Sequence, residues 1–232
     1  MTADRRSELA ANLAAVHQRI ERAATAAGRD PGEITLVAVT KTRPASDLEH
    51  LAALGVQHVG ENREQEADAK HAAVAVPLVW HFIGRLQTNK ARAVARWADV
   101  VESVDRIALV EPLARGAAAA GRRLAVLLQV SLDGDPERGG VPVNQLDELA
   151  AEVVAHDALE LRGVMAVAPL GVDPALAFAD LARVHESLLA LHPDAVVRSA
   201  GMSGDLEQAV AAGATHLRVG TALLGARPPI VR

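Results

Sequence analysis

Apolar residues recur along this chain in short runs, and most runs are followed by a stretch with helical spacing. A helical stretch also precedes the first run, with the spacing of an amphipathic helix that ends at a glycine. Its apolar positions are Leu9, Leu13, Val16 and Ile20, and the glycine is Gly28. Each of the eight apolar runs that follow is expected to form a buried strand. The runs cover residues 34–41, 56–60, 78–83, 99–104, 124–131, 161–167, 195–200 and 215–220.

The segments between the runs have the spacing and composition of helices. They cover residues 44–54, 62–73, 86–97, 105–120, 143–156, 173–191 and 204–212. This alternation predicts an α/β fold, a single (β/α)8 TIM barrel with an extra N-terminal helix. We expect one domain over residues 1–232, because little chain follows the eighth run. The alternative is an open doubly wound sheet, which is disfavoured because no G-x-G-x-x-G follows the first run.

The composition narrows the classes of function. Hydrophobic residues make up 50% of the chain and aromatic residues only 2%, so small aliphatic side chains must fill the core. The net charge of −5 and the pI of about 6.0 argue against a nucleic-acid surface. Because there is no cysteine, disulfides and thiolate metal sites are excluded. No metal-ligand spacing, secretory signal or membrane span is evident, so we expect a cytoplasmic protein without a metal.

The first apolar run ends at a lysine, Lys41. Lysine is rare in this chain, since only Lys41, Lys70 and Lys90 are lysines among 24 basic residues. The carboxyl end of a buried parallel strand is where α/β proteins place their chemistry. Unlike arginine, lysine can lose its proton when it is desolvated, and a neutral amine can attack a carbonyl. Lys41 is therefore a candidate Schiff-base lysine, although a lysine that only extends into solvent at a strand end is equally consistent.

Polar residues and glycines follow several of the other runs. Because the carboxyl ends of barrel strands meet on one face, these residues should lie near Lys41. They are Asn62 after the second run, Ser199 and Ser203 at and after the seventh, and Gly220 and Thr221 after the eighth. Barrels often bind phosphate with the loops after strands seven and eight. The alternatives are that Ser203 is an ordinary helix cap and Gly220 an ordinary turn residue.

Arg218 lies inside the eighth apolar run, where an arginine is rarely buried without a partner. Two interpretations stay open: it pairs with a carboxylate such as Glu61, or it faces a ligand. His81, between two aromatic residues, is expected to be a hydrogen-bonded core residue rather than a metal ligand.

A lysine opposite a phosphate site suggests a ligand with an aldehyde at one end and a phosphate at the other. Pyridoxal 5′-phosphate fits that description.

Six segments of the chain resemble the pyridoxal phosphate homeostasis proteins, also called the YggS/PROSC family. They are VAVTKT, VGEN at 59–62, WHFIGRLQTNK at 80–90, GVMAV at 163–167, GMSGDLEQA at 201–209 and RVGTALLGAR at 218–227. The segments occur in order across almost the whole chain, and their combination is highly specific. The resemblance implies the barrel domain of an alanine racemase standing alone, which binds pyridoxal 5′-phosphate as a Schiff base.

The resemblance also implies a role for seven residues. Lys41 would form the Schiff base, Arg218 would face the pyridine nitrogen, and Asn62 would line the ring pocket. The phosphate would be held by Ser203, Gly220 and Thr221. Ser199 would assist them.

Two positions depart from the family pattern. Arg85 stands where the family often has proline, and Gly204 replaces a residue that is commonly acidic.

Members of this family have no established catalytic activity and are implicated in intracellular cofactor balance. Alanine racemase takes a tyrosine from a second domain and related decarboxylases a cysteine, and this chain contains neither residue type. We therefore expect a protein that holds and releases its cofactor without turnover. The alternatives are a racemase-like enzyme, a Schiff-base aldolase that acts on a sugar phosphate, and a scaffold. The expected partners are the small-molecule cofactor and enzymes that accept it, and the expected state is a monomer.

Overall fold

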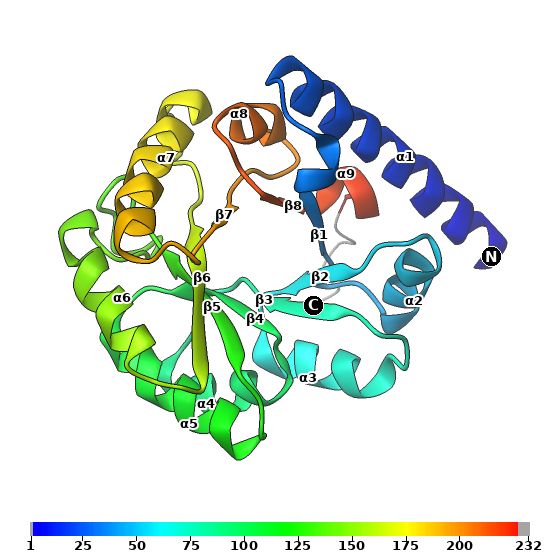
Figure 1. Ribbon diagram of the computed structural model, residues 1–232. Coiled ribbons are helices and arrows are strands. Elements are labelled where there is room, and N and C mark those ends of the chain that lie inside the picture. The colour runs from blue at the N-terminus through cyan, green and yellow to red at the C-terminus, as the bar shows by residue number, and fades with distance from the viewer. Residues whose placement is uncertain (1, 227–232) are drawn as a thin grey trace.

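Eight parallel strands close into a barrel in the order of the sequence (Figure 1). The computed structural model describes residues 2–226 of the 232-residue chain. The strands are β1 Thr35–Val39, β2 His58–Glu61, β3 Val79–Phe82, β4 Val100–Val104, β5 Leu124–Gln129, β6 Leu159–Met165, β7 Val197–Ser199 and β8 His216–Val219. Each lies within or overlaps one of the predicted runs. The pairing of β1 with both β2 and β8 confirms the TIM barrel and rules out the open sheet.

Helices surround the barrel and connect its strands (Figure 1). They are α1 Thr2–Ala26, α2 Ala45–Ala53, α3 Glu64–Ala73, α4 Thr88–Trp97, α5 Val110–Ala119, α6 Leu146–Val154, α7 Pro174–Leu191, α8 Leu206–Ala211 and α9 Thr221–Leu224. Three short 3-10 helices complete the described elements: η1 Pro31–Glu33, η2 Ile107–Leu109 and η3 Val143–Gln145. Among residues 2–226, no helix has an apolar stretch long enough to cross a membrane.

Helix α1 is the predicted extra N-terminal helix, and it packs on α8 and α9 outside the barrel (Figure 1). All four apolar positions of its predicted stripe are buried, from Leu9 to Ile20. The helix ends at Ala26, and Gly28 follows with a φ of 66°, a left-handed conformation that glycine adopts without a steric penalty. The predicted domain limits of 1–232 stay a prediction, and residues 1 and 227–232 lie outside the described residues.

The register of β1 brings distant parts of the chain to one edge of the barrel. Val37 is paired with Arg218 on β8, and Val39 is paired with Gly60 on β2. The residues that follow these three parallel strands therefore emerge at the same end of the barrel. Residues separated by about 180 positions in the sequence become neighbours in this way.

Candidate functional site

Lys41 follows β1 at the carboxyl end of the barrel and is partly exposed. Thr40 before it is fully buried, whereas Thr42 after it is exposed. Thr42 has a φ of 66°, and among the described residues it is the one position other than glycine with a positive φ. This conformation is unfavourable for a β-branched residue and is found where the surrounding structure enforces it. The chain therefore turns sharply immediately after the candidate lysine.

A buried ionic cluster lies directly beneath this turn. Glu61, at the end of β2, accepts hydrogen bonds at its Oε1 from Thr40 Oγ1 at 2.6 Å and from Lys70 Nζ at 2.8 Å. Burial raises the pKa of Glu61 above its usual value, and the hydrogen bonds from Lys70 and Thr40 oppose that rise. The predicted pairing of Arg218 with a carboxylate is found, but the carboxylate is Glu102, at 3.7 Å, and not Glu61, which was the suggested example. Lys70 was not among the residues predicted for the site. Two features of the sequence could have pointed to it: lysine is rare in this chain, and Lys70 lies nine residues after Glu61.

Arg218 is buried inside the barrel with partners on two other strands and the end of a third. Its Nη1 donates to Ser199 Oγ at 2.7 Å, and its Nη2 donates to the carbonyl oxygen of Ala166 at 2.8 Å. The Ser199 hydroxyl in turn donates to Glu102 Oε2 at 2.6 Å, which leaves that carboxylate oxygen 3.7 Å from the guanidinium. The Ser199 hydroxyl therefore connects Arg218 to Glu102, and the assistance to the phosphate that was predicted for Ser199 stays a prediction.

Glu102 connects Arg218 to a second polar group, the imidazole of His81. Burial by itself raises the pKa of Glu102, but hydrogen bonds from His81 and Ser199 and the charges around it hold the pKa at about 2. Because a carboxylate only accepts, His81 Nδ1 must donate in the 2.7 Å bond to Glu102. His58 Nδ1 lies 3.0 Å from the other ring nitrogen of His81. His81 is thus the hydrogen-bonded core residue that was predicted, and no metal-binding group of His, Cys, Asp or Glu occurs in residues 2–226.

The loops after β7 and β8 meet beside β1. Ser203 Oγ accepts a hydrogen bond from the backbone N–H of Ala222 at 3.1 Å, which ties the two loops together. Gly220 lies so close to β1 that an added Cβ would be 3.4 Å from the Cβ of Val39. Thr221 begins α9 and is exposed. Lys41, Ser203, Gly220 and Thr221 are therefore brought to one end of the barrel, as predicted, with hydroxyl and backbone N–H donors available there.

Asn62 belongs to a neighbouring part of the same face. It lines a cleft of about 1300 Å³ that runs over the ends of β2 to β5. The walls of this cleft also include Arg85 and Lys90, and Lys90 pairs with Glu64 at 3.1 Å. Lys41, Ser203 and Arg218 are not among the lining residues of this cleft. Asn62 thus lies in the cleft wall, and its predicted place in the ring pocket stays a prediction.

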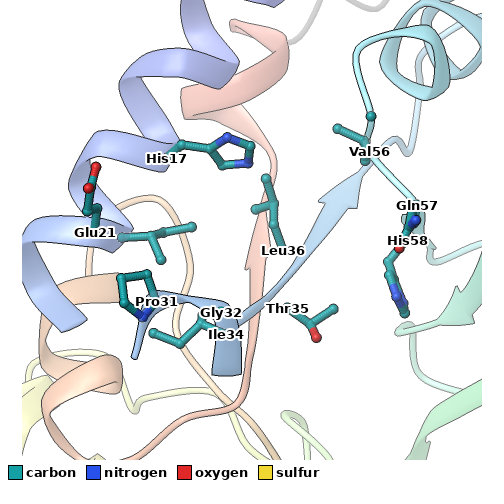
Figure 2. Close-up of a pocket in the computed structure, with 12 residues that line it drawn as sticks. His17, Glu21, Pro31, Gly32, Ile34, Thr35, Leu36, Val56, Gln57 and His58 are labelled. Atoms are coloured by element: carbon teal, nitrogen blue, oxygen red, sulfur yellow. The ribbon is translucent and has the colours of Figure 1, made fainter. Parts of the chain in front are cut away.

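A second cavity, of about 510 Å³, lies at the opposite end of the barrel. It is bounded by α1, η1 and the starts of β1 and β2, and Figure 2 shows His17 and Leu36 among the side chains that line it. His58 belongs to its wall and also to the chain of hydrogen bonds that leads through His81 to Glu102. This cavity has no signal in the sequence pattern, because its residues come from segments that are each typical of a strand start or a helix.

A lysine at the end of a strand thus lies at the same end of the barrel as two loops with hydrogen-bond donors. The sequence of the chain is also similar to a known family. Residues 11–228 match the family model described as "Alanine racemase, N-terminal domain". A "Pyridoxal phosphate homeostasis protein" from Mycobacterium tuberculosis is 47% identical over 244 residues, which cover 97% of this chain and 95% of that protein. The chain belongs to the family of pyridoxal phosphate homeostasis proteins.

Solved structures agree with this membership of the family. A structure from Bifidobacterium adolescentis, described as an unknown protein, superposes with a TM-score of 0.88 at 33% identity, covering 95% of this chain and 96% of that one. PipY of Synechococcus elongatus, described with pyridoxal phosphate bound, superposes with a TM-score of 0.79 at 37% identity. That superposition covers 89% of this chain and all of PipY, 100%. The family and the fold expected from the sequence motifs are therefore confirmed.

Proposed function

We propose that this protein binds pyridoxal 5′-phosphate through a Schiff base to Lys41 and takes part in intracellular homeostasis of that cofactor. The observation that supports this most directly is the proximity of the end of β1 to Gly220 and to the linked loops of Ser203 and Ala222. An amine and a set of anion donors then face one ligand. The names of the relatives and the cofactor described for PipY point in the same direction.

The donors present suit each end of this cofactor. A phosphate group is bound in proteins by hydroxyls and backbone N–H groups at loops and helix starts, which Ser203, Gly220 and Thr221 offer. A neutral amine adds to an aldehyde carbon and the oxygen leaves as water, so that a C=N bond replaces C=O. In this proposal Lys41 provides that amine, and Asn62 borders the ring from the side of the cleft.

Arg218 faces the pyridine nitrogen in this proposal, and Ser199 acts by holding its guanidinium. A bound pyridoxal phosphate supplies an electron sink, and that sink is strongest when its ring nitrogen is protonated. A permanently charged guanidinium disfavours this protonation. Together with the absence of tyrosine and cysteine from the sequence, this supports a carrier without turnover rather than a racemase-like enzyme. We further propose that it acts as a cytoplasmic monomer and passes the cofactor to enzymes that accept it.

Absorption titration with pyridoxal 5′-phosphate tests this function. We expect a visible Schiff-base band in the wild type and in Lys90→Ala, and none in Lys41→Ala. Lys90 is the matched control, because its amine pairs with Glu64 in the neighbouring cleft. Amino-acid racemisation and sugar-phosphate cleavage assays on the same three proteins should give no activity above the Lys41→Ala background. A wild type that develops no band at any cofactor concentration would contradict the proposal.

A further inference from the structure

Lys70, on α3, is a buried lysine with every donor of its ammonium group occupied. Only 7% of the residue is exposed. Its Nζ donates to the carbonyl oxygen of Thr40 at 2.8 Å, to Glu61 Oε1 at 2.8 Å and to Glu66 Oε1 at 2.6 Å. An ammonium has three N–H groups, and these three acceptors use all of them. Two carboxylates and one carbonyl oxygen therefore hold the Lys70 side chain in one position.

Partners of Lys70 hold the peptide groups on both sides of Lys41. The carbonyl oxygen of Thr40 belongs to the peptide bond before Lys41, and Lys70 binds it directly. The N–H of Thr42 belongs to the peptide bond after Lys41, and it donates to Glu66 Oε1 at 2.5 Å. That is the same carboxylate oxygen that Lys70 binds. One ionic cluster therefore contacts both peptide groups that flank the candidate Schiff-base residue.

The backbone needs such support at this point. The left-handed φ of 66° at Thr42 is strained for a β-branched residue, so it persists only where surrounding contacts enforce it. The bond from Thr42 N–H to Glu66 is such a contact, and the Glu66 carboxylate is itself fixed by Lys70. On the other side, Glu61 binds both the Thr40 hydroxyl and Lys70. Removing Lys70 would leave two carboxylates beside the turn with no shared cation between them.

We infer that Lys70 is a positioning residue, which with Glu61 and Glu66 fixes the backbone around Lys41 and so sets where the Lys41 amine meets the cofactor aldehyde. This rests on the function proposed above and extends it. The two lysines have different roles. Lys70 holds the backbone through its three hydrogen bonds, and the partly exposed Lys41 forms the covalent bond. The competing explanation is that the cluster only fastens α3 to the barrel, and the two explanations predict different results.

The test compares Lys70→Met with Lys90→Met. Methionine keeps an unbranched stem but removes the ammonium, and Lys90 is a matched control because it forms a single ion pair with Glu64 at 3.1 Å. The first readout is the rate at which borohydride traps pyridoxal 5′-phosphate on Lys41, followed by peptide mass spectrometry. The second is the affinity for pyridoxine 5′-phosphate, which has the same ring and phosphate but an alcohol in place of the aldehyde, so it binds without a covalent bond.

A positioning role affects the covalent step selectively. We expect Lys70→Met to slow trapping on Lys41 by about tenfold to a hundredfold, the size of effect that a small misplacement of a reacting group produces. Its affinity for pyridoxine 5′-phosphate should match that of the wild type, and Lys90→Met should match the wild type in both measurements. Wild-type trapping by folded Lys70→Met would overturn the inference. So would an equal loss of covalent and non-covalent binding, because a purely structural role produces that result.

Two cases need a separate test: a Lys70→Met protein that does not fold, and a wild type that traps no cofactor. If Lys70→Met does not fold, Glu66→Ala replaces it, because this change removes the oxygen that both Lys70 and the Thr42 N–H bind. The Glu66 side chain is 25% exposed, and the contact between Lys70 and Glu61 does not depend on it. Slower trapping with unchanged pyridoxine 5′-phosphate binding is again expected, and wild-type trapping by Glu66→Ala overturns the inference. If the wild type itself traps no cofactor on Lys41, the proposed function fails. Failure of the positioning role alone is distinguishable, because the wild type then still traps the cofactor.

Discussion

At the scale of single residues, the buried charges of this barrel are paired across strands. Arg218 is 4% exposed and Glu102 is completely buried, and their nearest charged atoms are 3.7 Å apart with the Ser199 hydroxyl bonded to both. Arginine keeps its proton, so Glu102 must supply the opposite charge inside the barrel. The low pKa of Glu102, about 2, is consistent with a carboxylate that is charged throughout the neutral range.

Replacement of Glu102 by glutamine should therefore be costly. The change removes the carboxylate with the largest charge interaction on Arg218 and leaves only the weaker one of Asp205. Breaking a buried ion pair by removing one partner costs about 3–5 kcal/mol. The control is Glu160→Gln, because Glu160 pairs with Arg162 at 2.9 Å but its side chain is 41% exposed. An exposed pair contributes about 0–1 kcal/mol. Urea denaturation measures both free energies of unfolding, and equal values for the two variants would contradict this account of Arg218.

At the scale of elements, two features set where α5 begins and how closely it packs. The predicted helix over 105–120 is divided, because η2 ends at Leu109 and α5 begins at Val110. Pro112 lacks an N–H, and a start at Val110 puts it in the first turn, where that N–H would have no helical partner. Further along α5, Gly116 faces α4, and an added Cβ there would lie 2.7 Å from the carbonyl oxygen of Arg92.

We expect Gly116→Ala to push α5 away from α4. The new methyl group would also approach the Cβ of Ala95 to 2.8 Å, and overpacking of this kind costs about 1–3 kcal/mol. The matched control is Gly204→Ala, where an added Cβ has nothing within 4 Å. That variant should unfold at the wild-type temperature or slightly above it. Thermal unfolding measures both, and a Gly116→Ala protein as stable as Gly204→Ala would show that the two helices have room to adjust.

At the scale of the whole molecule, the interior of the barrel is polar along part of its length. His58 and His216 are the first residues of β2 and β8, and they lie close to His81 of β3, with ring centroids 5.2 to 6.2 Å apart. Burial lowers the pKa of both His58 and His216 to about 4, mutual repulsion with the other histidines adds to this, and Glu102 opposes it. Asp99 also raises the pKa of His58, and Arg162 lowers that of His216. The folded barrel therefore favours the neutral imidazoles of His58 and His216.

Stability should therefore fall as the pH decreases from about 6.5 towards 5. The unfolded chain takes up a proton on each of these histidines near pH 6.5, whereas the folded protein does not until about pH 4, so the unfolded state binds more protons in this range. Glu102 acts at lower pH: its stabilisation is complete above its unfolded pKa near 4.5 and is lost as the pH falls towards 2. Between pH 7 and 5, the change in the free energy of unfolding therefore reports on the histidines and not on Glu102.

The variant His216→Gln should flatten this pH dependence. After allowance for its partial exposure, His216 should account for about 1 kcal/mol of the loss between pH 6.5 and 5. Urea denaturation at several pH values gives the slope for each protein. His156→Gln serves as the control, because His156 follows the end of α6, is partly exposed and pairs with Glu152 at 3.4 Å. If the His216 variant follows the wild-type slope, the buried histidines are not the origin of the effect.

The sequence alone determined the elements, their order and the position of Lys41. These depend on neighbours two to four residues apart, on glycine and proline at element ends, and on the rule that parallel strands present their carboxyl ends on one face. Only the tertiary structure decided which buried charges meet. Ser199 and Glu102 are 97 residues apart, and Arg218 and Ala166 are 52 apart. Barrel closure and strand register bring such pairs together, and no local pattern encodes them, which is why the Glu61 partner was mistaken and the roles of Lys70 and Glu102 went unseen.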